Sequence, residues 1–166
     1  ARTRGVIAAA HAEARNSITA RMWPYRGITG PGNDFDFTGS RHRDGPEIFL
    51  DTFTGKLIAD CNSAYDAVQT ASDGRIVRAA CVAHARRKVF NARANHPTHA
   101  AMLLSMFQRL YDIEDRAKTC SAAERQGLRQ AEAKPIWEQM REYINGQAVH
   151  DVLPKDSFGQ ALTYLR

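Results

Sequence analysis

The order of apolar and polar positions gives the first half of the chain short alternating segments and the second half a helical period. Apolar residues around Trp23 predict a short strand, and Phe35 and Phe37 alternate with polar neighbours as in a second strand. The turn-prone segment 27–33 separates the two, so we expect a hairpin. Residues 1–16 show little alternation and predict no defined structure beyond a frayed helix.

The remainder of the first half predicts helices and short buried strands in alternation. Residues 44–46, Asp-Gly-Pro, are typical of a helix start. The apolar run 56–60 predicts a buried strand that ends at the carboxylate of Asp60, and residues 65–68 predict a short helix. After a turn at 73–74, residues 76–81 form a second buried strand. This order predicts an α/β arrangement.

The second half predicts three helices. Apolar residues recur at spacings of three and four, which indicates helices from about 83 to 94 and from about 98 to 118. Ser121 and Glu124 form a capping-box pattern that opens the third helix. Pro135 should kink or split that helix, because proline lacks the backbone N–H that an inner helical position donates.

Composition favours a non-membrane protein with free thiols. The chain has 166 residues, 43% of them hydrophobic, which is enough for one ordinary core, and no apolar run is long enough to span a bilayer. The three cysteines are an odd number without paired spacing, so a reducing cytoplasm is the expected setting. The chain begins with Ala1 and stops within the apolar helical pattern 161–165, so we expect both ends to be internal to a longer protein.

Positive charge is concentrated in one stretch. Lys and Arg outnumber Asp and Glu by 23 to 18, and no acidic residue occurs from Gly74 to Tyr111. The cations of this stretch include Arg75, Arg78, Arg86, Arg87, Lys88, Arg93 and Arg109. Such a surface can neutralise phosphates, which makes nucleic acid the first partner to consider. A solvated basic face is the alternative.

Asp60 is the first candidate for chemistry. An acid at the carboxyl end of a buried strand points toward the crevice where open α/β sheets bind ligands. Taken alone, an aspartate at this place is more often a turn or helix-cap residue. Its neighbours, a hairpin before it and a strand and basic segment after it, favour the ligand-binding role.

Several short motifs occur in the order of a known family. They are Phe35–Thr38, Arg43–Pro46, Ala59–Asp60, Ala64–Ala67, Cys81–Lys88 and Val152–Ser157 with Gly159–Ala161. Over roughly residues 17 to 166 the chain resembles the insertion-sequence 66 transposase family. The resemblance implies a DNA transposase with an RNase H-like mixed sheet, here incomplete and without its first strand, followed by a helical insertion. The implied divisions are a poorly defined segment 1–16, a partial core 17–82 and a helical region 83–166.

The resemblance also implies the chemistry. Such transposases hold two Mg²⁺ or Mn²⁺ ions with an Asp, Asp, Glu triad and cleave and join DNA by phosphoryl transfer. Asp60 matches the second acid and would be a metal ligand. No aspartate precedes Asp34, and the third acid would follow Arg166, so the chain alone is expected to bind no ion stably and to be inactive. Asp34 and Asp36 fall on the hairpin and are not taken as substitutes. The alternative is a noncatalytic DNA-binding or protein-contact remnant.

Cys81 and His84 form a Cys-x-x-His pair whose role, by the resemblance, is structural. A zinc site would need Cys61 or Cys120 and a further histidine, and the second closely spaced pair is absent. A thiol enzyme would need an exposed, activated cysteine and a third orienting group.

Arg86, Arg87 and Lys88 follow His84 within one helical turn and are the candidate phosphate contacts. The implied partners are DNA, both transposon ends and target, and further copies of the complete enzyme, in a nucleoid-associated cytoplasmic setting. Trp23, Trp137 and the Phe residues are expected to fill the core, because no aromatic ladder is interleaved with the cations.

Overall fold

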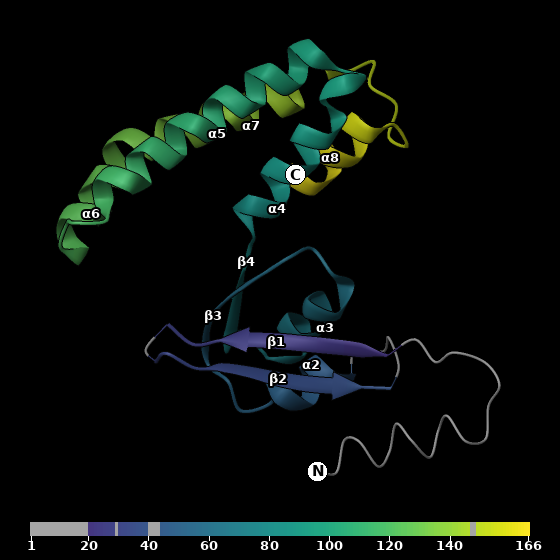
Figure 1. Cartoon of the computed structure of the whole chain (residues 1–166), viewed down its shortest axis with the longest axis vertical. Helices are drawn as coiled ribbons and strands as arrows, with labels where there is room; N and C mark the ends of the chain where they lie inside the picture. The colour runs from purple at the N-terminus through teal and green to yellow at the C-terminus, as the bar shows by residue number, and fades with distance from the viewer. Residues whose placement is uncertain (1–19, 29, 40–43, 147–148) are drawn as a thin grey trace. The chain divides into compact units, whose positions relative to one another are not determined.

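The computed structural model describes residues 20–28, 30–39, 44–146 and 149–166, and the chain divides into two compact units, 1–80 and 81–166. Both are drawn in Figure 1, and each has its own hydrophobic core. The segment 1–16 and Ile18, on which the first predicted strand partly depended, lie outside the described residues.

Among its described residues, the first unit pairs its strands two by two (Figure 1). Its elements are β1 (Arg21–Arg26), β2 (Asn33–Thr38), α2 (Asp44–Phe49), β3 (Gly55–Ala59), α3 (Ser63–Ala71) and β4 (Ile76–Ala80). Strands β1 and β2 form the expected antiparallel hairpin, with Trp23 opposite Asp36. Strands β3 and β4 are parallel, with Gly55 opposite Ile76 and Ala59 opposite Ala80.

The connection from β3 to β4 runs through α3. The side chain of Asn62 caps α3 by accepting a hydrogen bond of 3.0 Å from the Ala64 N–H. The turn into β4 uses positive φ angles at Asp73 (47°) and Gly74 (82°), a conformation in which glycine and aspartate carry little strain. A strand, helix, parallel strand unit results, as the sequence predicted.

The core of the first unit is small. Leu50, Val68 and Ile76 are buried together, and Tyr65 packs against them while meeting Trp23 edge-on at 5.9 Å. Trp23 is 4% exposed, as expected for a core residue, and its indole N–H donates to the Thr38 hydroxyl at 3.0 Å. The hairpin is therefore attached to the helices through aromatic side chains.

The expectation that β3 and β4 are buried strands is only half right. Leu57 and Ile76 face the core, but Ile58 and Val77 are 71% and 57% exposed. Side chains alternate between the two faces of a strand, so the apolar residues of these strands divide between a covered and an uncovered face. Parallel sheets are usually covered on both faces, and within the described residues only one face is.

The second unit is helical. Its elements are α4 (Val82–Asn91), the short 3₁₀ helix η1 (Ala92–Ala94), α5 (Pro97–Ala117), α6 (Ala122–Leu128), the π-helical segment η2 (Arg129–Ala133), α7 (Lys134–Asn145) and α8 (Ser157–Leu165). The helices predicted near 83–94 and 98–118 are confirmed as α4 with η1 and as α5. None of the helices in the described ranges combines the length and apolar character that crossing a bilayer requires.

The third predicted helix contains a π-helical segment. It opens at the predicted capping box, in which the Glu124 N–H donates to the Ser121 hydroxyl at 3.3 Å and the Ser121 N–H donates to the Glu124 carboxylate at 2.8 Å. The π-helical segment η2 then separates α6 from α7, and Pro135 lies in the first turn of α7. The chain stays helical through η2, so the α-helix is interrupted near Pro135 but not broken.

The core of the second unit is built mainly from α5, α7 and α8. Phe107 and Phe158 are fully buried within it. The prediction of a core position is wrong for Trp137, which is 39% exposed, and for Phe90, which is 40% exposed. Ile136 and Met140, four residues apart, face the core, and residue 137 is turned about 100° from the first of them.

Candidate functional site

Asp60 lies where the sequence places it, directly after the last residue of β3 and at the carboxyl end of a parallel strand. Its Oδ1 accepts a hydrogen bond of 3.2 Å from the Asn62 N–H. Asn62 in turn caps α3, so the short segment between strand and helix has a fixed conformation. The Oδ2 atom of Asp60 makes no hydrogen bond within the described part of the chain.

Arg78 holds this turn from the neighbouring strand. Its Nη2 donates a hydrogen bond of 2.8 Å to the backbone carbonyl of Asp60, and its Nη1 forms an ion pair with Asp66 on α3. The Arg78 side chain is 10% exposed, so it is unavailable for phosphate. The sequence analysis placed Arg78 in the basic surface and missed this structural role. Its position two residues after Ile76 would have indicated the role, because the two side chains lie on the same covered face of β4.

The charge of Asp60 acts on Tyr65. Burial raises the pKa of the Tyr65 phenol above its usual value, and the nearby Asp60 carboxylate raises it further. The Tyr65 phenol therefore stays protonated and uncharged next to Asp60.

Asp60 has no matching acids around it. Among residues 20–28, 30–39, 44–146 and 149–166, no group of three or more His, Cys, Asp or Glu side chains could hold a metal ion. Asp34 and Asp36 both lie on β2, and the Asp36 carboxylate accepts the N–H of its own neighbour Phe37 at 2.9 Å. These carboxylates alone do not fit the coordination of a pair of divalent ions.

Cys81 and His84 open α4. Cys81 occupies the N-cap position, and its backbone carbonyl accepts the N–H groups of His84 at 3.1 Å and Ala85 at 3.2 Å. The His84 Nδ1 is buried without a hydrogen-bond partner among the described residues. The pair thus lies at the start of the helix, on the boundary between the two units.

The three candidate phosphate contacts on α4 differ in availability. The guanidinium of Arg86 lies 6.0 Å from the centre of the Tyr111 ring, and the Lys88 ammonium lies 5.3 Å from the centre of the Tyr164 ring. Such cation–π contacts hold both side chains against the second unit. Arg87 is exposed and makes no hydrogen bond or ion pair within the described ranges.

The match to a known family covers almost the whole chain. The model of the Transposase IS66 family matches residues 6–166. The chain belongs to this transposase family. That relationship agrees with the motif order of the sequence, whose most specific parts are the segment that opens α4 and the segment that precedes α8.

Curated relatives of this transposase family member come from Sinorhizobium fredii (strain NBRC 101917 / NGR234). The uncharacterized protein y4hP is 28% identical over 148 residues, covering 76% of this chain and 27% of that protein. The uncharacterized protein y4qI is 30% identical over 139 residues, covering 75% and 26% respectively. The chain thus spans about a quarter of the length of the relatives it matches. No solved structure matches it significantly.

The family motif before α8 builds the start of that helix. Asp156 caps α8 by accepting the Phe158 N–H at 2.8 Å, and its Oδ1 lies 2.8 Å from the His96 Nε2. The Phe158 N–H and, secondarily, His96 hold the pKa of the Asp156 carboxyl below its usual range. Gly159 follows at a position where any Cβ would meet the Leu153 carbonyl oxygen. This part of the transposase motif is therefore structural.

Proposed function

We propose that the chain is part of the catalytic region of a DNA transposase and that Asp60 is one of its metal-binding carboxylates. The observation that carries the proposal is the position of Asp60, at the carboxyl end of a parallel strand and fixed by Arg78, in a chain of a transposase family. Ligand-binding acids of α/β sheets occupy such positions.

We propose that residues 17–82 form part of an RNase H-like sheet. Within the described residues, β1 pairs only with β2 and β3 only with β4, so each pair keeps a free edge. Free edges of exposed strands are prone to pairing, and another strand supplied by the longer protein would complete the sheet. In this proposal residues 83–166 are a helical insertion, in which Cys81 and His84 have a structural role at its entrance.

The proposal assigns the remaining catalytic acids to other parts of the longer protein. One carboxylate cannot clamp two ions about 3.5–4 Å apart. When all the acids are present, Mg²⁺ or Mn²⁺ would activate the attacking oxygen and stabilise the leaving oxygen. The part of this chain is to orient Asp60: the Asn62 N–H engages Oδ1, Arg78 anchors the backbone, and Oδ2 is left as the candidate ligand atom.

DNA, as transposon end and as target, is the proposed substrate. Arg87 is the best placed of the three α4 cations to contact a phosphate, because Arg86 and Lys88 already lie over aromatic rings. Phosphate contacts of this kind position DNA without reading its sequence. We propose that the complete protein acts as a homo-oligomer in the bacterial cytoplasm, on the nucleoid.

The decisive experiment uses the complete protein with a plasmid that carries the ends of its element, in Mg²⁺ or Mn²⁺. Cleavage and strand transfer are expected, and Asp60→Asn should abolish both. Asp51→Asn is the matched control, because Asp51 is an exposed acid of the same unit. Undiminished strand transfer by the Asp60→Asn protein would refute the assignment of Asp60.

The chain by itself is expected to be inactive, since its described residues contain no metal-binding cluster. The alternative function is that of a noncatalytic remnant that binds DNA or another protein. The two differ in the complete protein: a remnant would show no strand transfer even with every acid intact. Metal-dependent cleavage by the isolated chain that Asp60→Ala abolishes would contradict the proposed incompleteness.

A further inference from the structure

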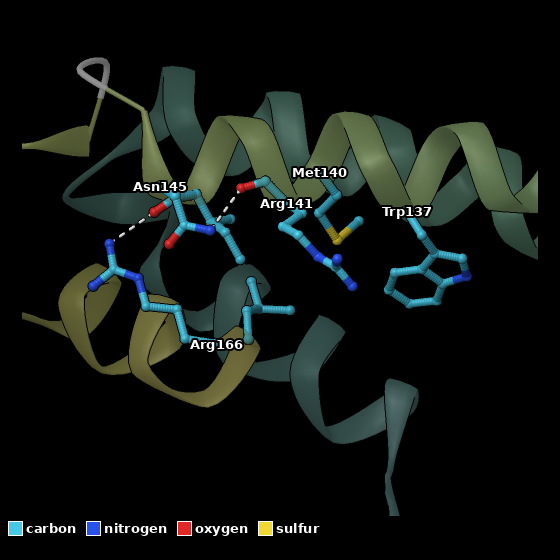
Figure 2. A pocket seen from close by; sticks show the side chains of 7 residues that line it. Trp137, Met140, Arg141, Asn145 and Arg166 are labelled. Atoms are coloured by element: carbon cyan, nitrogen blue, oxygen red, sulfur yellow. Dashed lines mark hydrogen bonds between the residues drawn. The ribbon is translucent and has the colours of Figure 1, made fainter.

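A groove runs along α7 on the second unit. Two hollows, of about 390 and about 550 Å³, lie beside this helix, and both are lined by Trp137 and Arg141. We call the two hollows together the α7 groove. Figure 2 shows Trp137 and Arg141 projecting from the same side of α7 in the smaller hollow, with Arg166 at its other end. The larger hollow extends to Tyr111 on α5.

Trp137 presents a rigid aromatic surface to the α7 groove. Its ring is 39% exposed and meets the fully buried Phe107 edge-on, at 6.5 Å and 86°. This contact fixes the indole on the core while much of it remains accessible. A side chain that is already ordered loses little conformational entropy when a second ring stacks on it.

The charges around Trp137 leave one cation without a partner. Lys134 and Arg141, three residues before and four after Trp137, share its face of the helix. The acids that line the larger hollow are already engaged: Glu114 accepts two hydrogen bonds from Arg129, at 2.7 and 2.6 Å, and Glu138 lies 4.0 Å from the Lys134 Nζ. The Arg141 guanidinium has no hydrogen bond or ion pair in the part of the chain that the structure describes.

A ring beside an uncompensated cation fits a ligand that has both a flat π-system and a negative charge. We infer that the α7 groove binds an unpaired nucleotide of single-stranded DNA, with the base stacked on Trp137 and a flanking phosphate on Arg141. Base stacking on aromatic side chains combined with phosphate contacts is the general mode of single-strand binding. An apolar helix would instead cover Arg141 without compensating its charge, which is costly.

The choice of DNA rests on the proposed function, but the site is separate from Asp60 and needs no catalysis. Its test therefore uses the chain as it is, without metal. The protein contains two tryptophans, and Trp23 is buried, so quenching of Trp137 fluorescence reports binding. The probes are an oligothymidylate of about ten nucleotides, an oligomer of the same length in abasic sugar-phosphate, and a blunt duplex.

The oligothymidylate is expected to quench the fluorescence and to bind at least about fivefold more tightly than the abasic oligomer, because each stacked base contributes substantially to affinity. Trp137→Ala should weaken binding by a similar factor, measured by anisotropy of a labelled oligomer. Arg141→Gln should weaken binding and reduce the salt dependence by about 0.7 in the log–log slope, the loss of one phosphate contact to a single strand. Lys155→Gln is the control, since Lys155 is exposed and lines neither hollow.

Three results would overturn the inference. One is equal affinity for the abasic oligomer, and another is unchanged binding by both variants. The third is a dimer that Trp137→Ala dissociates, in a protein that does not bind the oligothymidylate, since the occupant would then be a second copy. Should Trp137→Ala unfold, as circular dichroism would show, Arg141→Gln decides alone, because Arg141 is exposed and outside the core.

Discussion

The guanidinium of Arg78, on β4, donates a hydrogen bond of 2.8 Å to the backbone carbonyl of Asp60 at the end of β3. The same guanidinium pairs with Asp66 on α3, so a single side chain connects the two parallel strands and the helix between them. The backbone of Asp60 is therefore fixed from the neighbouring strand. Such preorganisation is what the proposed metal-binding role of Asp60 would require.

Arg78→Gln should destabilise the first unit. The change removes a charged hydrogen bond and an ion pair from a side chain that is 10% exposed, and we expect a loss of about 1–3 kcal/mol. Urea unfolding followed by Trp23 fluorescence, in a Trp137→Phe background, measures it. Arg26→Gln, at an exposed arginine of β1, is the control and should change the unfolding free energy by less than about 0.5 kcal/mol. Equal effects of the two substitutions would show that the Arg78 contacts contribute nothing.

Gly159 and Gly127 should respond in opposite directions to alanine. A Cβ at Gly159 would collide with the Leu153 carbonyl oxygen, so the backbone before α8 must move, at a cost of about 1–3 kcal/mol or more. Gly127 lies inside α6, where a methyl group would meet nothing within 4 Å, and alanine there should stabilise by about 0.5–1 kcal/mol. Thermal melts of both variants test this. A Gly159→Ala protein as stable as the parent would show that the close approach is absent.

We expect the hydroxyl of Tyr25 to contribute nothing to stability. Its ring stacks on Phe49 at 3.9 Å and 6°, but the hydroxyl oxygen is buried without a partner among the described residues. Burial raises the pKa of this phenol, with Tyr65 and Asp36 adding to the effect. Tyr25→Phe should therefore leave the unfolding free energy unchanged or raise it by up to about 1 kcal/mol, whereas Tyr25→Ala should lower it by about 3 kcal/mol. A clear loss in Tyr25→Phe would reveal a hydrogen bond to the hydroxyl.

The elements that follow from local signals could be read from the sequence. The capping box at Ser121 depends on neighbouring residues alone and is confirmed, and near Pro135 the third helix changes to a π-helical segment without breaking. Burial of whole strands was less predictable. An apolar run such as 56–60 looks the same whether one face or both faces are covered, and the structure exposes Ile58.

The candidate site was predictable only in part. Asp60 was found because it ends an apolar run, a local signal, and the structure places it at a strand end. The role of Arg78 depends on partners 12 and 18 residues away, which strand pairing brings together. From the sequence, Arg78 was counted only as one of many basic residues. Trp137 was assigned to the core because no aromatic ladder is interleaved with the cations, but its helix turns it outward beside Arg141.

The ion pair between Glu114 and Arg129 should make the second unit lose stability in acid. The two hydrogen bonds from Arg129, at 2.7 and 2.6 Å, hold the pKa of the Glu114 carboxyl below its usual range. A folded-state pKa below the unfolded value of about 4.3 means that the stabilisation is complete above that pH and disappears as the pH falls through the folded pKa.

Glu114→Gln should therefore lower the melting temperature of the helical unit at neutral pH and have a decreasing effect below about pH 4. Both side chains are more than 40% exposed, so solvent screening limits the difference to less than about 1 kcal/mol, and high salt should reduce it further. Circular dichroism melts across the pH range measure the difference. Glu142→Gln, an exposed acid of α7 without an ion pair in the described ranges, is the control. A Glu114 effect that persists undiminished in acid would assign it to packing of the side chain and not to its charge.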